Sequence, residues 1–235
     1  MQALKFKLKR KTLNTIYISY LRPILEYASI VWDNCTLYDK ESLEKLQYEA
    51  ARVVTGLTRS VSIERLLSEI GWVPLSDRRT IQKLTLVYKD KHGYLPEYLS
   101  DLFPPAVQVT TPYHLRNNNN YVTVQQRLEI FSKSVIPSST KLWNDFDNDI
   151  KNSPTLSSFK SNLKRYFKPP FVPKYFLSGD RTFSVYHARL RNYCSNLNAD
   201  LFRNHLRQNS FCDCGHPYED AEHYFFKCAR YTQQI

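Results

Sequence analysis

The residues best suited to chemistry lie near the end of the sequence, between positions 212 and 228. Three of the five cysteines and two of the six histidines fall within this short stretch. The spacing Cys-x-Cys-x8-His-x4-Cys offers three thiolates and one imidazole, which fill a tetrahedral shell around zinc and leave no open position for a substrate. We therefore predict a structural zinc site with the ligands Cys212, Cys214, His223 and Cys228.

Two alternatives to this site stay open at the level of sequence. His216 or His205 could serve as the fourth ligand in place of His223, or the cysteines could form a disulfide or remain free buried thiols. Five cysteines is an odd number for disulfide pairing, and the lysine-rich start resembles no secretory signal peptide. Both features favour an intracellular protein, nuclear or cytoplasmic, where clustered cysteine and histidine more often bind metal. We also expect the aromatic residues 224–226 to shield one side of the site.

The positive charge of the sequence is the second guide to its chemistry. Lysine and arginine number 33 against 22 acidic residues, which gives a formal net charge of +11. A basic protein of this size attracts polyanions, and RNA or DNA is the commonest of these. A solvated helix face would explain the same clusters without any partner. The predicted phosphate contacts are Lys5, Lys7, Lys9, Arg10, Lys11, Arg189 and Arg191.

Several function classes find no support in the sequence. No apolar run approaches the roughly 18 residues that a membrane-spanning helix needs, so we expect no membrane partner. The motifs of phosphate-binding loops, α/β-hydrolases and zinc proteases are absent from the sequence. We therefore expect neither an enzyme nor a protein with a small-molecule substrate.

Apolar residues recur mostly at helical spacing, so the sequence predicts a mainly α-helical protein. We expect a helical bundle at residues 1–102, a linker or small β-hairpin followed by helices at 103–168, and C-terminal helices with the zinc-binding segment at 169–235. Alternation at residues 107–109 and 121–124 suggests the hairpin. Pro23 should kink the first helix and Gly56 should end the second. The predicted helices are residues 12–32, 39–55, 62–70, 76–92, 96–102, 139–146, 154–166, 184–194 and 200–208.

A set of blocks along the chain carries a family resemblance. The blocks are Tyr17, Tyr20-Leu21-Arg22-Pro23-Ile24-Leu25-Glu26-Tyr27-Ala28, Val31-Trp32-Asp33, Leu43-Glu44, Leu46-Gln47, Ala50-Ala51-Arg52, Thr55-Gly56, Leu142-Trp143-Asn144, Ser153-Pro154, Ser158-Phe159-Lys160, and the tail from Cys212 to Cys228. Together they resemble the region beyond the palm in the reverse transcriptases of LINE-type (non-LTR) retrotransposons, in particular those of jockey-like mobile elements. The first and last blocks are fairly specific, whereas the middle ones are loose.

This resemblance implies a thumb and a C-terminal zinc-knuckle tail that hold nucleic acid. The polymerase of such an element needs an Asp-Asp pair for its metal ions, and no Asp-Asp occurs in the sequence. The chain then corresponds to the thumb and tail alone, as in a decayed or fragmentary copy of the element. We expect non-catalytic nucleic-acid binding. The rival expectation is a structural or protein-interaction module that zinc stabilises and that has no nucleic-acid role.

Overall fold

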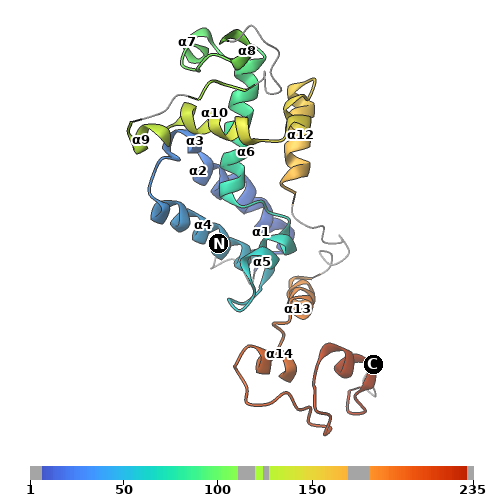
Figure 1. Ribbon diagram of the computed structural model, residues 1–235. Helices are drawn as coiled ribbons and strands as arrows, with labels where there is room; N and C mark the ends of the chain where they lie inside the picture. The colour runs from blue at the N-terminus through green and yellow to red at the C-terminus, as the bar shows by residue number, and fades with distance from the viewer. Residues whose placement is uncertain (1–6, 111–119, 124–126, 169–179, 232–235) are drawn as a thin grey trace. The chain divides into compact units, whose positions relative to one another are not determined.

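The computed structural model describes residues 7–110, 120–123, 127–168 and 180–231. The protein is mainly helical, as the periodicity predicts, and no described helix is long and apolar enough to cross a membrane (Figure 1). In chain order the elements are α1 (Arg10–Ile16), the π-helical turn η2 (Tyr17–Leu21), α2 (Arg22–Glu26), α3 (Ser29–Trp32), α4 (Leu37–Thr55), α5 (Ile63–Ile70), α6 (Leu75–Lys91), α7 (Glu97–Ser100), α8 (Val107–Thr110), α9 (Glu129–Ser132), α10 (Val135–Asp145), α11 (Asn148–Lys151), α12 (Leu156–Tyr166), α13 (Arg181–Arg191), α14 (Asn198–Arg203) and the π-helical turn η4 (His223–Lys227).

The chain forms two compact units, and each is built from separate stretches of sequence. Unit 1 comprises residues 1–21, 46–72 and 169–235, and unit 2 comprises residues 22–45 and 73–168. These units differ from the three consecutive domains expected from the sequence. The boundary predicted between residues 168 and 169 coincides with a boundary of these units, whereas the one predicted between 102 and 103 does not, because packing joins stretches far apart in the chain. Residues 169–173, at the start of the third predicted domain, lie outside the described residues.

Unit 1 is held by contacts between α1, the end of α5 and the segment after it. Tyr17 stacks on Trp72, with ring centroids 3.8 Å apart, and both side chains are buried. The indole N–H of Trp72 donates to Asn14 Oδ1 at 2.8 Å, so its polar atom is satisfied inside the contact. Stacking and hydrogen bonding together fix α1 against the chain that leaves α5.

The first predicted helix is interrupted before Pro23, as expected for a residue that cannot donate a backbone hydrogen bond. The α-helical pattern of α1 gives way to the π-helical turn η2, and α2 then carries Pro23 in its second position. A π-helical turn accommodates an extra residue where the regular i→i−4 pattern is broken. Ala28, with φ of 49°, then separates α2 from α3.

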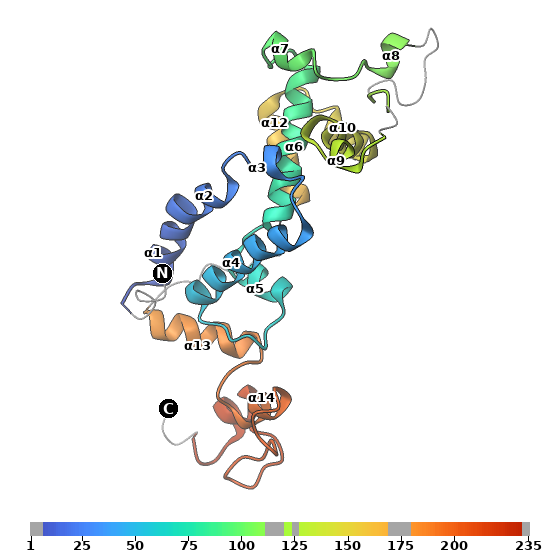
Figure 2. The ribbon, with the colours of Figure 1, turned by 90° about the vertical axis from the view of Figure 1, so that its left-hand side faces the viewer.

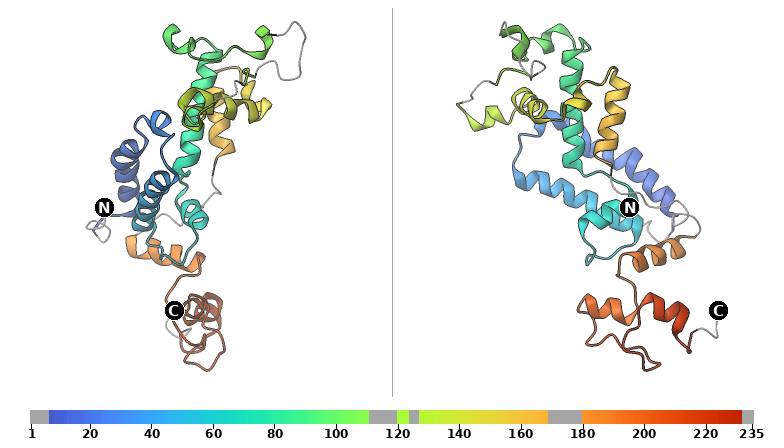
Figure 3. Two further views of the ribbon diagram at one scale, coloured as in Figure 1. Left: turned by 60° about the vertical axis from the view of Figure 1, so that its left-hand side comes forward. Right: turned by 45° about the vertical axis from the view of Figure 1, so that its right-hand side comes forward.

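Unit 2 is organised around α6, which lies beside α10 and α12 in all views (Figures 2 and 3). Tyr88 of α6 stacks on Phe159 of α12 at 4.3 Å, and its hydroxyl donates to the carbonyl of Ser153 at 2.8 Å. Each apolar side chain buried here adds about 1.5–3 kcal/mol of transfer free energy to stability. The buried members of this core are Leu84, Val87, Tyr88, Tyr121, Trp143, Phe159 and Leu163.

In the described residues the predicted hairpin is reduced to one short pairing, in which the N–H of Val107 donates to the carbonyl of Asn120 at 2.9 Å and the N–H of Val122 to that of Pro105 at 3.0 Å. Residues 107–110 are the helical turn α8, and the only pairing described nearby is a single antiparallel bridge between Ala106 and Tyr121. The side chain of Asn144 on α10 holds the other edge of this segment, because it accepts from the N–H of Tyr121 and donates to its carbonyl, both at 2.9 Å. These two backbone groups face away from Ala106, so Asn144 fixes Tyr121 against α10. Position 124 lies outside the described residues.

Candidate metal centre

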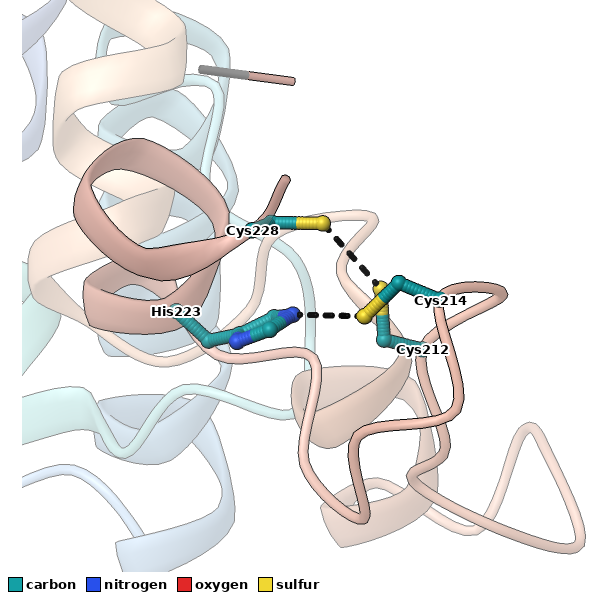
Figure 4. A group of neighbouring side chains, drawn as sticks. All are labelled: Cys212, Cys214, His223 and Cys228. Atoms are coloured by element: carbon teal, nitrogen blue, oxygen red, sulfur yellow. Dashed lines mark hydrogen bonds between the residues drawn. The ribbon is translucent and has the colours of Figure 1, made fainter. Parts of the chain in front are cut away.

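The structure brings the ligand atoms of Cys212, Cys214, His223 and Cys228 into one group. One atom from each side chain lies within 4.8 Å of all the others (Figure 4). The Sγ atoms of Cys212 and Cys228 are 3.8 Å apart, and Cys214 Sγ lies 3.3 Å from His223 Nε2. Ligand atoms around tetrahedral zinc are separated by about 3.5–3.8 Å, given bonds of about 2.0–2.3 Å. The group could therefore hold a metal ion with little rearrangement.

A tight turn presents the first two cysteines. The N–H of Gly215 donates to the carbonyl of Cys212, and the N–H of Cys212 donates to the carbonyl of His216, both at 2.9 Å. Gly215 has φ of 92°, a conformation that a side chain would strain. Because the turn closes within five residues, both thiols of the short Cys-x-Cys spacing face the same point.

A helical turn presents the other two ligands. Asp220 begins it by accepting a hydrogen bond from the N–H of His223 at 2.8 Å through its carboxylate, as an N-cap residue does. The turn is π-helical, and the N–H of Cys228 donates to the carbonyl of His223 five residues earlier at 2.8 Å. The wider turn lets residues five apart, rather than four, face the same side. His-x4-Cys therefore suits this element.

The site is joined to α14 by Glu219 and Asn198, two residues that no sequence motif marks. Glu219 is buried, and its carboxylate accepts from the N–H of Asn198 at 3.0 Å and from the thiol of Cys212 at 3.8 Å. The amide of Asn198 donates to the carbonyl of Phe211 at 2.6 Å, next to the first ligand. Nothing in the local pattern could have identified these two residues, since their partners lie 13 and 21 positions away.

The thiols of Cys212 and Cys214 differ in acidity. Burial raises the pKa of the Cys212 thiol to about 12. The backbone N–H of His216 donates towards Cys214 and lowers the pKa of that exposed thiol below its ordinary value. A metal ion binds the thiolate form of each cysteine, so binding would displace protons and would weaken in acid.

The structure also places the alternative ligands. His216 stacks on His223 with ring centroids 4.1 Å apart, but its Nδ1 is engaged with the backbone of Tyr218. His216 and His205 are both exposed, and neither belongs to the four-atom group. The buried Nδ1 of His223 has no hydrogen-bond partner among the described residues. None of the five cysteines, all of which lie in the described residues, forms a disulfide, and the 3.8 Å between the Sγ atoms of Cys212 and Cys228 far exceeds the roughly 2.05 Å of a disulfide bond.

The expected aromatic shield over the site is largely wrong. Phe226 is 78 % exposed and Phe225 39 % exposed, whereas Tyr224 is half-buried and its ring lies tilted against that of Tyr231, with centroids 4.4 Å apart. Because the π-helical turn directs His223 and Cys228 inward, the residues between them must point outward. The buried carboxylate of Glu219 contacts the site instead, at 3.8 Å from Cys212 Sγ.

The predicted phosphate contacts divide into two groups. Lys7, Lys9 and Lys11 are exposed, whereas Lys5 lies outside the described residues. Arg10 is only 5 % exposed, and it donates to the carboxylate of Glu69 at 3.0 Å and to its carbonyl at 2.6 Å. Burial lowers the pKa of Arg10, and the charge of Glu69 offsets part of this effect. Its guanidinium is already bound inside unit 1, so Arg10 is a structural residue.

The two arginines of α13 also have partners within unit 1. Arg191 donates to the same carboxylate of Glu69 that Arg10 contacts, so it is a structural residue as well. Arg189 donates through Nε to the carbonyl of Gly56 at 2.9 Å. Its two terminal nitrogens have no partner among the described residues, which sets it apart from Arg10 and Arg191.

Comparison with known proteins finds no match for this chain. The chain matches no protein-family model, no curated protein and no solved structure.

Proposed function

We propose that this chain is a non-catalytic nucleic-acid-binding protein whose C-terminal segment folds around a structural zinc ion. The convergence of Cys212, Cys214, His223 and Cys228 carries the proposal. Three sulfur donors and one imidazole are the donor set of structural zinc sites, whereas calcium and magnesium require oxygen ligands. With four protein ligands the shell is closed, so the ion would stabilise the fold and activate no water.

The distribution of charge supports different roles for residues 193–231 and for the rest of the chain. Residues 193–231 contain four basic side chains, Arg203, Arg207, Lys227 and Arg230, against five acidic ones. Three thiolates on a divalent ion would add one further negative charge. The excess that makes the whole chain +11 therefore lies in the rest of the sequence. The zinc segment would secure the structure, and exposed lysines such as Lys7, Lys9 and Lys11 would contact phosphates.

The resemblance to the thumb and tail of LINE-type reverse transcriptases supports the same function. A single origin in such an element would explain the zinc-binding tail, the basic helical region and the missing Asp-Asp pair. On this proposal the chain contacts RNA or DNA without transferring nucleotides. Primer extension on an RNA template should therefore stay at the level of a no-protein control.

The proposal is tested by nucleic-acid binding at several salt concentrations. Fluorescence anisotropy with labelled RNA and DNA of mixed sequence should give affinities that fall steeply with salt. Replacing Lys7, Lys9 and Lys11 together by alanine should weaken binding similarly for all sequences. It should lower the slope of log K against log salt by about 2–3 units, because three phosphate contacts are lost.

A matched control removes three positive charges from unit 2 instead of from the start of the chain. Lys141, Lys160 and Lys164 are exposed lysines of unit 2, and their triple alanine variant should retain most of the wild-type slope. Wild-type protein that carries zinc but binds neither RNA nor DNA would refute the nucleic-acid role. Such a result would favour the protein-interaction module, for which the zinc site only secures a fold.

A further inference from the structure

A pocket in unit 1 has the composition of an anion site. It lies between the C-terminal end of α4 and helix α13, which meet there (Figure 2). Its volume is about 480 Å³, which falls within the range of roughly 300–1,000 Å³ seen for small-ligand sites. We call it the α4–α13 pocket. Three arginines line it: Arg52, Arg181 and Arg189.

The end of α4 holds these guanidinium groups in fixed positions. Arg181 donates to the carbonyls of Val54 at 2.7 Å and Val53 at 2.5 Å, and Arg189 donates to that of Gly56 at 2.9 Å. Carbonyls at a helix C-terminus have no intrahelical partner, so the arginines satisfy them and balance the negative end of the helix dipole. Bonds to neutral carbonyls leave each guanidinium with its full charge.

Donor capacity remains unused in the pocket. The terminal nitrogens of Arg189 have no partner in the part of the chain that the structure describes. The buried Nε of Arg52 also lacks a hydrogen-bond partner there, and its nearest carboxylate oxygen, on Glu49, is 3.9 Å away. Burial lowers the pKa of Arg181, and the nearby charge of Arg10 lowers it further, as expected in positive surroundings.

Two acidic residues also line the pocket, and they do not cancel the three arginines. Glu49 contacts Arg59, an 83 % exposed arginine outside the lining, at 3.3 Å. Asp180 precedes α13, and its side chain makes no capping hydrogen bond. The first turn of α13, where the helix dipole is positive, adds to the attraction for an anion.

The walls of the pocket are built by close packing. Gly56 has φ of 77°, and a Cβ placed on it would lie 2.6 Å from Cγ2 of Val185 on α13. The two helices can therefore approach this closely only with glycine at position 56. Tyr186, which is 54 % exposed, lines the same pocket and offers an aromatic face beside the arginines.

We infer that the α4–α13 pocket binds the phosphate group of a nucleotide, with Arg189 as its principal ligand and Tyr186 beside the base. Guanidinium groups with free terminal nitrogens bind phosphate oxygens in pairs, and aromatic faces stack on bases of any sequence. The phosphate belongs either to a free nucleotide or to a nucleic-acid strand. The second source rests on the proposed nucleic-acid binding, whereas the phosphate site itself does not.

The substitution Arg189→Gln isolates the free part of this side chain. The amide nitrogen of glutamine occupies the same chain position as Nε of arginine, so it can still donate to Gly56. The charge and both terminal nitrogens are lost. Calorimetric titration of the full chain with inorganic phosphate and with a nucleoside 5′-monophosphate should show binding at least about tenfold weaker for Arg189→Gln than for the wild type, since a charged hydrogen-bond pair is removed.

Two further variants keep the test independent of folding defects. Arg165→Gln removes the same charge from an exposed position on α12 of unit 2 and should bind phosphate like the wild type. Asp180→Asn removes a negative charge from the pocket while asparagine remains a good N-cap residue, so it should bind phosphate several-fold more tightly. A gain of affinity cannot come from a damaged fold. Equal phosphate affinity in the wild type, Arg189→Gln and Asp180→Asn would overturn the inference.

Oligonucleotides distinguish the source of the phosphate and separate this inference from the proposed function. If the pocket takes a strand end, a 5′-phosphorylated strand should bind more tightly than its 5′-hydroxyl counterpart, and inorganic phosphate should abolish the difference. If it takes an internal phosphate, Arg189→Gln should weaken both strands more than Arg165→Gln does. Strands that bind the wild type, with equal losses in the two variants, would refute the role of the pocket and leave the proposed function intact. Binding of phosphate in the pocket without binding of any strand would support the pocket and refute the proposed nucleic-acid binding.

Discussion

At the scale of single residues, the partner decides what a side chain does. Lys9, Arg10 and Lys11 are neighbours in sequence, yet both lysines are exposed while Arg10 is buried against Glu69. Leaving Glu69 without its arginines would strand a buried charge, which costs about 3–5 kcal/mol in comparable pairs. Exposure does not decide the role of a cysteine either. Cys214 is exposed, yet its Sγ lies in the group of four ligand atoms that could hold a metal ion.

Replacing Cys214 by serine should release the metal. The thiol is exposed, so the substitution removes a ligand with little loss of packing. Metal content measured by plasma mass spectrometry should fall from about one zinc per chain to a small fraction of it. Trypsin should then cleave at Arg207 or Lys227 faster, because metal binding supplies folding free energy to this segment.

A second cysteine substitution controls for the loss of a thiol. Cys35→Ser changes a half-buried cysteine in unit 2, outside the metal group, and should retain both the metal and the resistance to trypsin. A chelator added to the wild type should reproduce the cleavage pattern of Cys214→Ser. Full metal content in Cys214→Ser would mean that the four side chains do not form the site.

At the scale of elements, the C-terminal end of α4 is where this helix packs against α13 in unit 1. Gly56 ends the helix with its N–H donated to the carbonyl of Arg52 at 2.8 Å, as the sequence predicts. The structure adds a second requirement, since Val185 of α13 occupies the space of a Cβ at this position. Conformation and close approach therefore both demand glycine.

Gly56→Ala should destabilise the protein more than an alanine at another left-handed glycine. Gly93 has φ of 68°, and a Cβ added there would meet nothing within 4 Å, so Gly93→Ala reports only the conformational cost of about 1–2 kcal/mol. Gly56→Ala should cost about 1–3 kcal/mol more, because overpacking is added. Urea unfolding measures the loss of unfolding free energy in both glycine variants. Val185→Ala in the same chain should recover the added part, and equal midpoints for the two glycine variants would contradict this account.

At the scale of the whole molecule, charge affects stability. The chain carries a net charge of +11, and acid adds to it. Unit 2 contains a cluster in which Asp33 contacts Lys83 at 2.6 Å, Arg79 at 2.8 Å and Lys40 at 3.3 Å. One carboxylate thus contacts three cations drawn from two helices, and Arg79 also lies 3.6 Å from the carboxylate of Glu44.

Asp33 should make stability depend on pH in the acid range. Burial alone would raise the pKa of Asp33, but the hydrogen bond and charge of Lys83, with Lys40, outweigh it and hold the pKa below its ordinary value. The stabilisation is therefore present above the unfolded-state pKa of about 3.9 and is lost as pH falls through the lower folded-state value. Asp33→Asn should cost about 1–3 kcal/mol at pH 7 and much less near pH 3. Urea unfolding at both pH values measures the difference, and a constant difference would exclude this role.

The sequence by itself determined those features whose causes lie within a few residues. Ser62 precedes α5 and accepts from the N–H of Arg65, and Gly56 ends α4, because caps act over three or four positions. Helical periodicity indicated the mainly helical fold. The four residues of the candidate metal centre could be identified from their spacing, since a tight turn and a short helical turn bring them together almost locally.

Only the tertiary structure decided the features whose partners are distant in the chain. Glu69 meets Arg10 across 59 positions and Arg191 across 122, which turned two predicted phosphate contacts into structural residues. The same holds for Asn144, which bonds the backbone of Tyr121 across 23 positions, and for the α4–α13 pocket, whose walls are joined by a hydrogen bond that spans 127 positions. Charge and periodicity describe a residue's own preferences. Which oppositely charged or apolar group meets it is settled by the packing of the whole chain, because burial leaves each polar group only the partners that packing brings to it.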